Sequence, residues 1–179
     1  MRTTFSSLFV AFFRPRGADL IEIKVPIMAS IPQFEPSCVE YADRVRSSFS
    51  NQPLMKLFDA QLIRIEPGII ELEVPFQAQL TQHNGYLHGG TVATLADTAC
   101  GYAAYSLMPN DSDVLTVEFK INFLSPAIGE RFVSEGRVLR MGRTIVVAQA
   151  DVFALLGERK KYIATMIATL ICIPNQTDP

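Results

Sequence analysis

The residues of this chain that could do chemistry gather in one stretch, HNGYLHGGTVATLADTACGYAAY at positions 83–105. The stretch contains both histidines of the protein, His83 and His88, and Asp97 is the single charged residue between positions 89 and 108. A carboxylate among small and apolar residues is costly to bury unless it is paired or used. Asp97 therefore suits a general base or a nucleophile at the floor of a cleft, and a structural carboxylate bonded to nearby groups is the alternative.

Small residues surround Asp97 on the expected helix. Gly90, Ala93, Gly101 and Ala104 share one helix face with Asp97 because they follow each other at three- and four-residue spacings. Their short side chains would let a narrow substrate, or another backbone, approach the carboxylate closely.

His88, Gly89 and Gly90 lie where a polar loop passes into that helix. Backbone N–H groups at a helix N-terminus are free to bind an acceptor, and the helix dipole adds positive potential there. They could bind the oxygen of a polarised carbonyl, as an oxyanion hole does. A tight loop-to-helix turn that needs glycine explains the same residues equally well.

Other chemistries find little support in the sequence. The spacings of His83, His88 and Asp97 match no zinc motif, so we expect no metal, and without a GxSxG, GxGxxG or P-loop motif we expect no cofactor. A net charge of −2 with scattered Lys and Arg argues against nucleic acid as a partner. Three widely spaced cysteines support neither a disulfide framework nor a metal knuckle and fit a reducing compartment.

The first half of the domain is expected to contain a helix and a hairpin. Helical spacing of apolar residues begins at Ser37, which forms a capping-box pattern with Glu40, and Pro53 should break this helix. Alternation with a period of two then predicts two strands, over 60–66 and 69–76, joined at a Pro-Gly turn.

The second half is expected to contain one long helix followed by four strands. The helix covers 89–107 and is apolar on all sides, so it needs cover on all sides. The strands are expected over 114–124, 130–141, 143–155 and 159–173. Within the first of them, apolar residues alternate cleanly with polar ones such as Thr116 and Glu118. This order of elements predicts an α+β fold in which a curved antiparallel sheet wraps the long helix.

Residues 1–27 stand apart from the single domain expected over residues 28–179. Residues 1–16 carry three Arg, several Ser and Thr, no acid and a short apolar run, a composition that resembles a targeting segment. Translation that truly begins at Met28 explains the same feature. No stretch approaches the roughly 20 apolar residues of a membrane-spanning helix. We expect a cytoplasmic protein, or an organellar one if residues 1–27 are a transit segment.

Residues 82–97, QHNGYLHGGTVATLAD, resemble the signature of the hotdog-fold acyl-CoA thioesterases. The likeness is strongest to the phenylacetate-pathway type, which is similar to the 4-hydroxybenzoyl-CoA thioesterases. It continues through TVEFKINFLSPA at 116–127 and covers roughly residues 50–173. The resemblance implies the hotdog fold, a long helix wrapped by an antiparallel sheet, which agrees with the predicted order of elements.

The resemblance also implies roles for five residues. Asp97 takes the place of the catalytic carboxylate, which activates water or attacks the thioester itself. Gly89 matches the glycine whose N–H polarises the thioester carbonyl, and His88 matches the histidine that shapes this loop near the leaving thiolate. Thr116 falls where relatives position the attacking water. Gln82 stands where the phenylacetate type usually has Asn and the hydroxybenzoyl type has Gln, so an amide is retained.

In this family each site takes its acid from one subunit and its glycine loop from the other, so the resemblance implies an obligate homodimer and allows a homotetramer built as a dimer of dimers. The implied reaction is hydrolysis of an acyl-CoA thioester to a carboxylic acid and free CoA. Gly90, Arg140, Gly142 and Arg143 are candidates for binding the CoA moiety, and solvated surface arginines are the alternative. We expect a medium-chain or aromatic acyl group in a pocket of apolar helix and strand residues. An acyl-CoA sensor without turnover and an acyl-thioester hydratase or dehydratase are the competing hypotheses.

Overall fold

The computed structural model describes residues 33–175, so the expectation for residues 1–27 lies outside this part of the chain. The helices and strands are α1 (Tyr41–Asn51), α2 (Pro53–Leu57), β1 (Gln61–Glu66), β2 (Ile69–Pro75), the short 3-10 helix η1 (Ala78–Leu80), α3 (Gly89–Tyr105), β3 (Ser112–Phe123), β4 (Arg131–Met141), β5 (Ile145–Leu156) and β6 (Arg159–Pro174). Among these residues no helix has both the length and the hydropathy that a membrane crossing requires.

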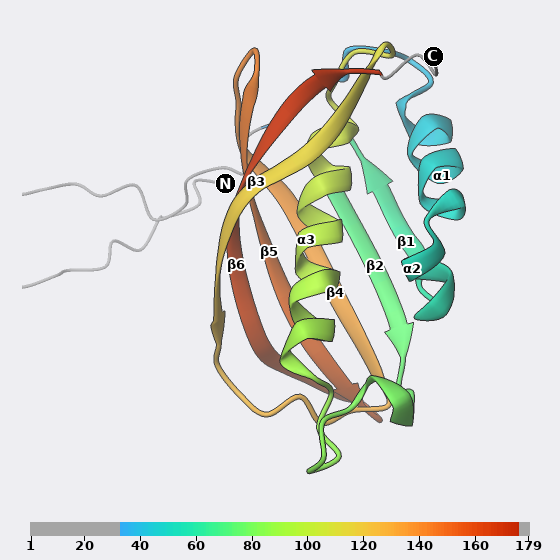
Figure 1. Ribbon diagram of the computed structural model, residues 1–179, viewed down its shortest axis with the longest axis vertical. Helices are drawn as coiled ribbons and strands as arrows, with labels where there is room; N and C mark the ends of the chain where they lie inside the picture. The colour runs from blue at the N-terminus through green and yellow to red at the C-terminus, as the bar shows by residue number, and fades with distance from the viewer. Residues whose placement is uncertain (1–32, 176–179) are drawn as a thin grey trace, which may run out of the picture. The chain divides into compact units, whose positions relative to one another are not determined.

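The six strands form one antiparallel sheet in the order β1-β2-β4-β5-β6-β3. The sheet curves around α3, which lies along one of its faces, while α1 and α2 lie next to the edge strand β1 (Figure 1). The strands on either side of α3 in the sequence, β2 and β3, are separated in the sheet by three others. The α+β prediction of a long helix wrapped by a curved antiparallel sheet is therefore confirmed.

Small residues allow α3 and the sheet to approach closely. Ala96, Ala99 and Ala103 of α3 are fully buried. A Cβ on Gly136 of β4 would lie 2.4 Å from the Ala99 carbonyl oxygen, which is too close for any side chain, so this position requires glycine. This contact sets the height of α3 above the sheet, and with it the height of Asp97.

Arg44 of α1 joins this helix to the C-terminal end of α3 and the start of β3. Its guanidinium donates hydrogen bonds to the carbonyl oxygens of Met108 at 2.8 Å and Ser112 at 2.6 Å. The same group lies 3.8 Å from the centre of the Tyr105 ring, within range of a cation–π interaction. These contacts place α1 beside the part of α3 that follows Asp97.

The start of α1 differs from the prediction. The helix begins at Tyr41, its N-cap residue is Glu40, and no side chain caps it. Ser37 Oγ donates instead to the Leu107 carbonyl oxygen at 2.6 Å, so a tertiary contact replaces the capping box. The predicted break at Pro53 is confirmed, because α1 ends at Asn51 and Pro53 begins α2.

A β-bulge changes which residues of β3 face α3. The pairing of β3 with β6 shifts register between Thr116 and Glu118, so Val117 is the extra residue. Strict alternation would place Thr116 and Glu118 on one face. Because of the bulge Thr116 turns toward α3, where it contacts Asp97, and Glu118 contacts Thr169 of β6 instead.

One stripe of α3 remains partly open. Gly90 is exposed, and Ala93, Asp97 and Gly101 are only half-buried, whereas Ala104 is fully buried. The stripe follows the small-residue face singled out in the sequence. The expectation of cover on all sides of the helix is therefore wrong for the described residues of a single chain.

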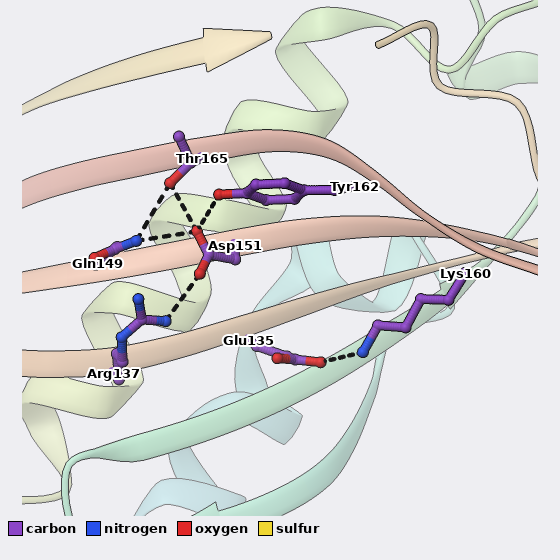
Figure 2. A network of polar contacts seen from close by, with 7 residues as sticks. All are labelled: Glu135, Arg137, Gln149, Asp151, Lys160, Tyr162 and Thr165. Atoms are coloured by element: carbon purple, nitrogen blue, oxygen red, sulfur yellow. Dashed lines mark hydrogen bonds and ion pairs between the residues drawn. The ribbon is translucent and has the colours of Figure 1, made fainter. Parts of the chain in front are cut away.

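The sheet face turned away from α3 carries a polar network centred on Asp151 of β5 (Figure 2). The Asp151 carboxylate accepts hydrogen bonds from Arg137 at 2.9 Å, Gln149 at 3.1 Å, Tyr162 at 2.6 Å and Thr165 at 2.7 Å. Burial would raise the pKa of Asp151, but hydrogen bonds led by those of Tyr162 and Thr165 outweigh it and lower the pKa below the ordinary value. Asp151 is a structural carboxylate with a full set of donors.

Candidate active site

Asp97 lies midway along α3 and contacts the strand beside it. Thr116 Oγ1 of β3 donates a hydrogen bond to Asp97 Oδ1 at 2.7 Å. Both residues line a cleft of about 360 Å³ between α3, the end of α1 and the start of β3. The rest of this cleft, which we call the Asp97 cleft, is lined by Ser48, Gln52, Thr98, Gly101, Tyr102, Tyr105, Asp113, Val114 and Leu115.

The environment of Asp97 favours a base. Burial raises the pKa of the Asp97 carboxyl above its ordinary value, and the hydrogen bond from Thr116 offsets this only in part. A carboxylate with a raised pKa accepts a proton more readily than a solvated one, as general-base catalysis requires. Asp151 shows what a structural carboxylate looks like in this chain, with four donors, whereas Asp97 has one among the described residues.

His88 caps the N-terminus of α3. Its Nδ1 accepts a hydrogen bond from the Gly90 N–H at 2.9 Å, so a neutral His88 ring carries its proton on Nε2. The Gly90 N–H is thereby used within the cap. The Gly89 N–H, in contrast, finds no acceptor in the part of the chain that the structure describes. Gly89 therefore offers a free backbone donor at this helix end.

Gly89 opens onto a second cleft of about 400 Å³, the Gly89 cleft. Gln82 lines the same cleft, and the Phe123 ring at the end of β3 lies against Gly89, 3.3 Å from where a Cβ would be. The other lining residues are Tyr86, Leu87, Val92, Leu124, Ser125, Pro126, Ala127 and Ile163. Of the residues implied by the resemblance, Gln82 and Gly89 thus share one cleft, and Asp97 and Thr116 share the other.

The two clefts lie too far apart to act together within one chain. Gly89 and Asp97 are eight residues apart on α3, which corresponds to about 12 Å along a helix axis. A carbonyl that is polarised by an N–H and attacked from a carboxylate must lie about 3 Å from each group. One copy of the chain therefore presents two separate half-sites, one with the candidate base Asp97 and one with the candidate oxyanion donor Gly89.

The remaining candidates lie outside both clefts. Arg140 is an exposed residue near the end of β4, and Gly142 and Arg143 form the tight turn to β5, in which the Gly142 N–H donates to the Ile145 carbonyl oxygen. His83 is exposed in the loop before α3. Within residues 33–175 no group of three His, Cys, Asp or Glu residues has the arrangement of a metal site.

The sequence missed several residues of the clefts. Ser48 and Gln52 reach the Asp97 cleft from α1, which lies more than forty positions earlier in the chain, and no local pattern links them to Asp97. Tyr102 lies on the same helix as Asp97, and its polar end could have been noticed in an otherwise apolar run. The Asp97 cleft is lined largely by hydroxyl, amide and carboxylate groups, whereas the Gly89 cleft contains the apolar helix and strand residues Val92, Phe123 and Ile163.

Comparison with known proteins agrees with this architecture. The family model of the thioesterase superfamily matches residues 84–159. The crystal structure of a thioesterase family protein from Silicibacter pomeroyi is 48% identical, covers 75% of this chain and 99% of its own, and superimposes with a TM-score of 0.74. The chain belongs to the thioesterase superfamily. It is a thioester hydrolase with the hotdog fold, as the sequence resemblance implied.

Two further relatives place this thioesterase within the superfamily. The medium/long-chain acyl-CoA thioesterase YigI of Escherichia coli is 26% identical over 134 residues, which are 66% of this chain and 84% of the relative. The Escherichia coli PaaI protein of the phenylacetic acid degradation operon shares the fold, with a TM-score of 0.69 at 20% identity over 76% of this chain and 95% of its own. The resemblance to the phenylacetate-pathway type is therefore confirmed at the level of the fold.

Proposed function

We propose that this thioesterase hydrolyses acyl-CoA thioesters to a carboxylic acid and free CoA, with Asp97 as the catalytic carboxylate. The observation that carries the proposal is the half-buried Asp97, which has a raised pKa and a single described donor, Thr116. The relative named as a medium/long-chain acyl-CoA thioesterase supports CoA esters as the substrate class.

In the proposed reaction the Gly89 N–H donates to the thioester oxygen as negative charge develops there. Asp97 either takes the proton of a water that attacks the carbonyl carbon, or attacks that carbon itself to form an anhydride that water then cleaves. In both cases the C–S bond breaks and CoA leaves as the thiolate, which acquires a proton. Thr116 orients the Asp97 carboxylate, and Gln82 lies where its amide can orient water.

We further propose that each site forms between two copies of the chain. The separation of the two half-sites along α3 supports this, and so does the open stripe of α3 on which Asp97 lies. β3 is an edge strand that exposes large apolar side chains over its length, which is unusual unless a partner covers them. The exposed fractions are 56% for Leu115, 56% for Val117, 46% for Phe119 and 56% for Phe123.

The two half-sites adjoin opposite ends of this same edge strand. Thr116 contacts Asp97 near the start of β3, and Phe123 contacts Gly89 at its end. If β3 pairs antiparallel with β3 of a second copy about a two-fold axis near its middle, the start of each strand meets the end of the other. Asp97 then approaches Gly89 of the second copy, and each dimer contains two complete sites.

The CoA moiety is proposed to contact Arg140 and Arg143 near the β4–β5 turn, since CoA carries phosphate groups and both arginines are exposed. Replacing both with Ala should raise KM for CoA esters more than KM for the same acyl group on a short uncharged thiol. An equal effect on both substrates contradicts this contact.

A panel of acyl-CoA esters with a thiol-reactive dye tests the reaction, and a mixed dimer tests the shared site. Asp97→Asn and Gly89→Pro are co-expressed with different affinity tags, and the heterodimer is isolated through both tags. A shared site predicts that each homodimer is inactive, while the heterodimer, with one intact site in two, recovers up to about half of the wild-type activity. A heterodimer as inactive as its parents contradicts the shared site, and tight CoA-ester binding without thiol release favours a sensor.

A further inference from the structure

The loop that leads into α3, at the lower end of the helix in Figure 1, closes on itself. The Gln82 N–H donates to the Tyr86 carbonyl oxygen at 2.9 Å, and the Gly85 N–H donates to the Gln82 carbonyl oxygen at 2.9 Å. Gly85 has a φ of +81°, which favours glycine, and a β-bridge joins the two sides of the loop at its base. Residues 81–87 therefore form one small unit, and the contacts at its base decide where Gln82 lies.

The two sides of this base meet at one oxygen, the Leu80 carbonyl. It accepts a hydrogen bond from the His88 N–H at 2.9 Å, which closes the loop, and a second from Thr91 Oγ1 at 3.2 Å. Thr91 belongs to the first turn of α3, and only 7% of it is exposed. Among residues 33–175 it is the one α3 residue whose side chain hydrogen-bonds to residues 78–82.

The Thr91 hydroxyl does not bond to its own helix. A threonine inside a helix commonly donates to the carbonyl oxygen four residues before it, as Thr94 does to Gly90 at 2.9 Å. Thr91 donates instead to Leu80, eleven positions earlier in the chain. A buried hydroxyl costs free energy unless it has a partner, so this bond specifies where the Leu80 carbonyl lies against the helix.

Packing alone would not fix the loop in this way. The Leu80 side chain is buried, but apolar burial is non-directional, whereas a hydrogen bond constrains both a distance and an angle. Gln82 follows Leu80 by two residues and lines the same cleft as Gly89, the first residue of α3. Thr91 lies on the same helix as Gly89, two residues farther on. The bond from Thr91 to Leu80 therefore sets the position of Gln82 relative to the Gly89 N–H.

We propose that Thr91 is a positioning residue that holds Gln82 beside the Gly89 N–H through the Leu80 carbonyl. The inference rests on the proposed function and adds to it a residue that lines neither cleft. Without the Thr91 hydroxyl, the bond between His88 and Leu80 still closes the loop but no longer fixes its angle to α3. Catalysis suffers more than stability, because a displacement of about 1 Å can cost about a hundredfold in rate, whereas one hydrogen bond contributes little to folding.

Substitutions of Thr91 separate its hydroxyl from its shape. Thr91→Val keeps the branched side chain without the hydroxyl, and thiol release should show kcat lowered about tenfold with KM within about threefold of the wild type. Thr91→Ser keeps the hydroxyl and should restore kcat to within about threefold. The Tm of Thr91→Val should fall by no more than about 4 °C, the effect of one lost hydrogen bond.

Thr94→Val is the matched control, because the Thr94 hydroxyl bonds within α3 and not to the loop. Its kcat should equal that of the wild type. Thr91→Ala is a second variant without the hydroxyl, so the result does not depend on whether valine fits at this position. Wild-type kcat in both Thr91→Val and Thr91→Ala, or an equal loss in Thr91→Ser and Thr91→Val, overturns the inference.

A double-mutant cycle tests whether Thr91 acts through Gln82. Thr91→Val should cost less than about twofold in kcat once Gln82→Ala is present, because the group that Thr91 positions is then absent. An equal loss in both backgrounds, or wild-type kcat in Gln82→Ala, contradicts the proposed role of Thr91.

Hydrogen exchange gives a readout that does not depend on turnover. The Gln82 and His88 N–H groups should exchange at least about fivefold faster in Thr91→Val than in the wild type, while the amides of β5 keep their wild-type rates. Unchanged exchange of both groups also overturns the inference. Failure of the proposed function would look different, because a folded wild-type protein would then release no thiol from any CoA ester, whatever the exchange rates.

Discussion

Asp97→Asn is the change that separates chemistry from stability most sharply. Asparagine keeps the size of the side chain and can still accept the Thr116 hydrogen bond through its carbonyl oxygen. It removes the negative charge and the ability to take a proton or attack a carbon. The substitution therefore leaves the shape of the cleft intact while it abolishes the proposed chemical role.

The expected loss of turnover is at least a hundredfold. A positioned general base contributes about 10²–10⁴ in rate, and each tenfold corresponds to about 1.4 kcal/mol of transition-state stabilisation. The loss thus amounts to about 3–5 kcal/mol of catalysis. The Gly89 N–H is untouched, so a residual rate above that of the uncatalysed reaction should remain.

Asp97→Asn is expected to keep or increase the stability of the folded protein, although it lowers turnover. Burial raises the pKa of Asp97 in the folded protein above its unfolded value, so folding favours the protonated form. The protein therefore loses stability as the pH rises through the pKa that Asp97 has in the unfolded chain and then through the pKa that it has in the folded protein. At neutral pH the charged Asp97 lowers the free energy of unfolding. Asp97→Asn removes this cost, so its Tm at pH 7 should equal or exceed that of the wild type.

Asp151→Asn is the matched control, because Asp151 is the other half-buried aspartate among residues 33–175 and its carboxylate also accepts side-chain hydrogen bonds. Its pKa is lowered in the folded protein, so its contribution is present above the unfolded pKa and is lost as pH falls through the folded pKa. Asp151→Asn should lower the Tm at pH 7, since Tyr162 and Arg137 lose a charged acceptor, and should leave kcat on the best CoA ester unchanged.

Thiol release and thermal unfolding by circular dichroism, each at several pH values, provide both measurements. In the wild type kcat/KM should rise with pH through the raised pKa of Asp97, since the reaction needs the carboxylate. Activity within threefold of the wild type for Asp97→Asn would refute the proposed mechanism. A large fall in the Tm of Asp97→Asn would refute the conclusion that the charged Asp97 carboxylate destabilises the folded protein at pH 7.

Three further predictions follow from single contacts. Gly89→Pro should lose about 10²–10³ in kcat relative to Gly89→Ala, because both substitutions add a Cβ near Phe123 but only proline removes the N–H. Proline fits at this first helical position because the backbone of His88 before it is extended. Equal rates for the two variants contradict the oxyanion role of Gly89. Ser134→Ala should be neutral or stabilising by about 1 kcal/mol in denaturant unfolding, because the fully buried Ser134 Oγ has no partner among the described residues. Phe119→Lys on the exposed edge β3 should shift the protein toward monomer in sedimentation and remove activity in parallel, whereas activity in a monomer contradicts the shared site.

Much of the architecture was predictable because it depends on local patterns. The period of two over β1 and β2, the Pro53 break and the long apolar run of α3 each follow from a few adjacent residues, and the structure confirms them. The bulge at Val117 was not predictable, because a register shift depends on the neighbouring strand β6. For the same reason the sequence alternation assigns Thr116 to the face opposite the one that binds Asp97.

The sequence indicates the residues of the candidate site that are unusual for their position, but it does not indicate the other residues that line the cleft. Asp97 stood out as the one charge in an apolar helix, and the structure places it beside Thr116, as the resemblance implied. Ser48 and Gln52 could not be assigned, because only the contacts of α1 with the end of α3 bring them to the cleft. The roles of Gly89, His88 and Gln82 in catalysis stay predictions.

The spacing of Gly89 and Asp97 along one rigid helix limits how this protein can evolve. Each inserted or deleted residue between them would turn Asp97 by about 100° around the α3 axis and away from Thr116. Point substitutions in the pocket are free of this penalty. New substrate ranges should therefore arise by exchange of side chains, above all on α1, while the length of the segment between residues 89 and 97 stays constant.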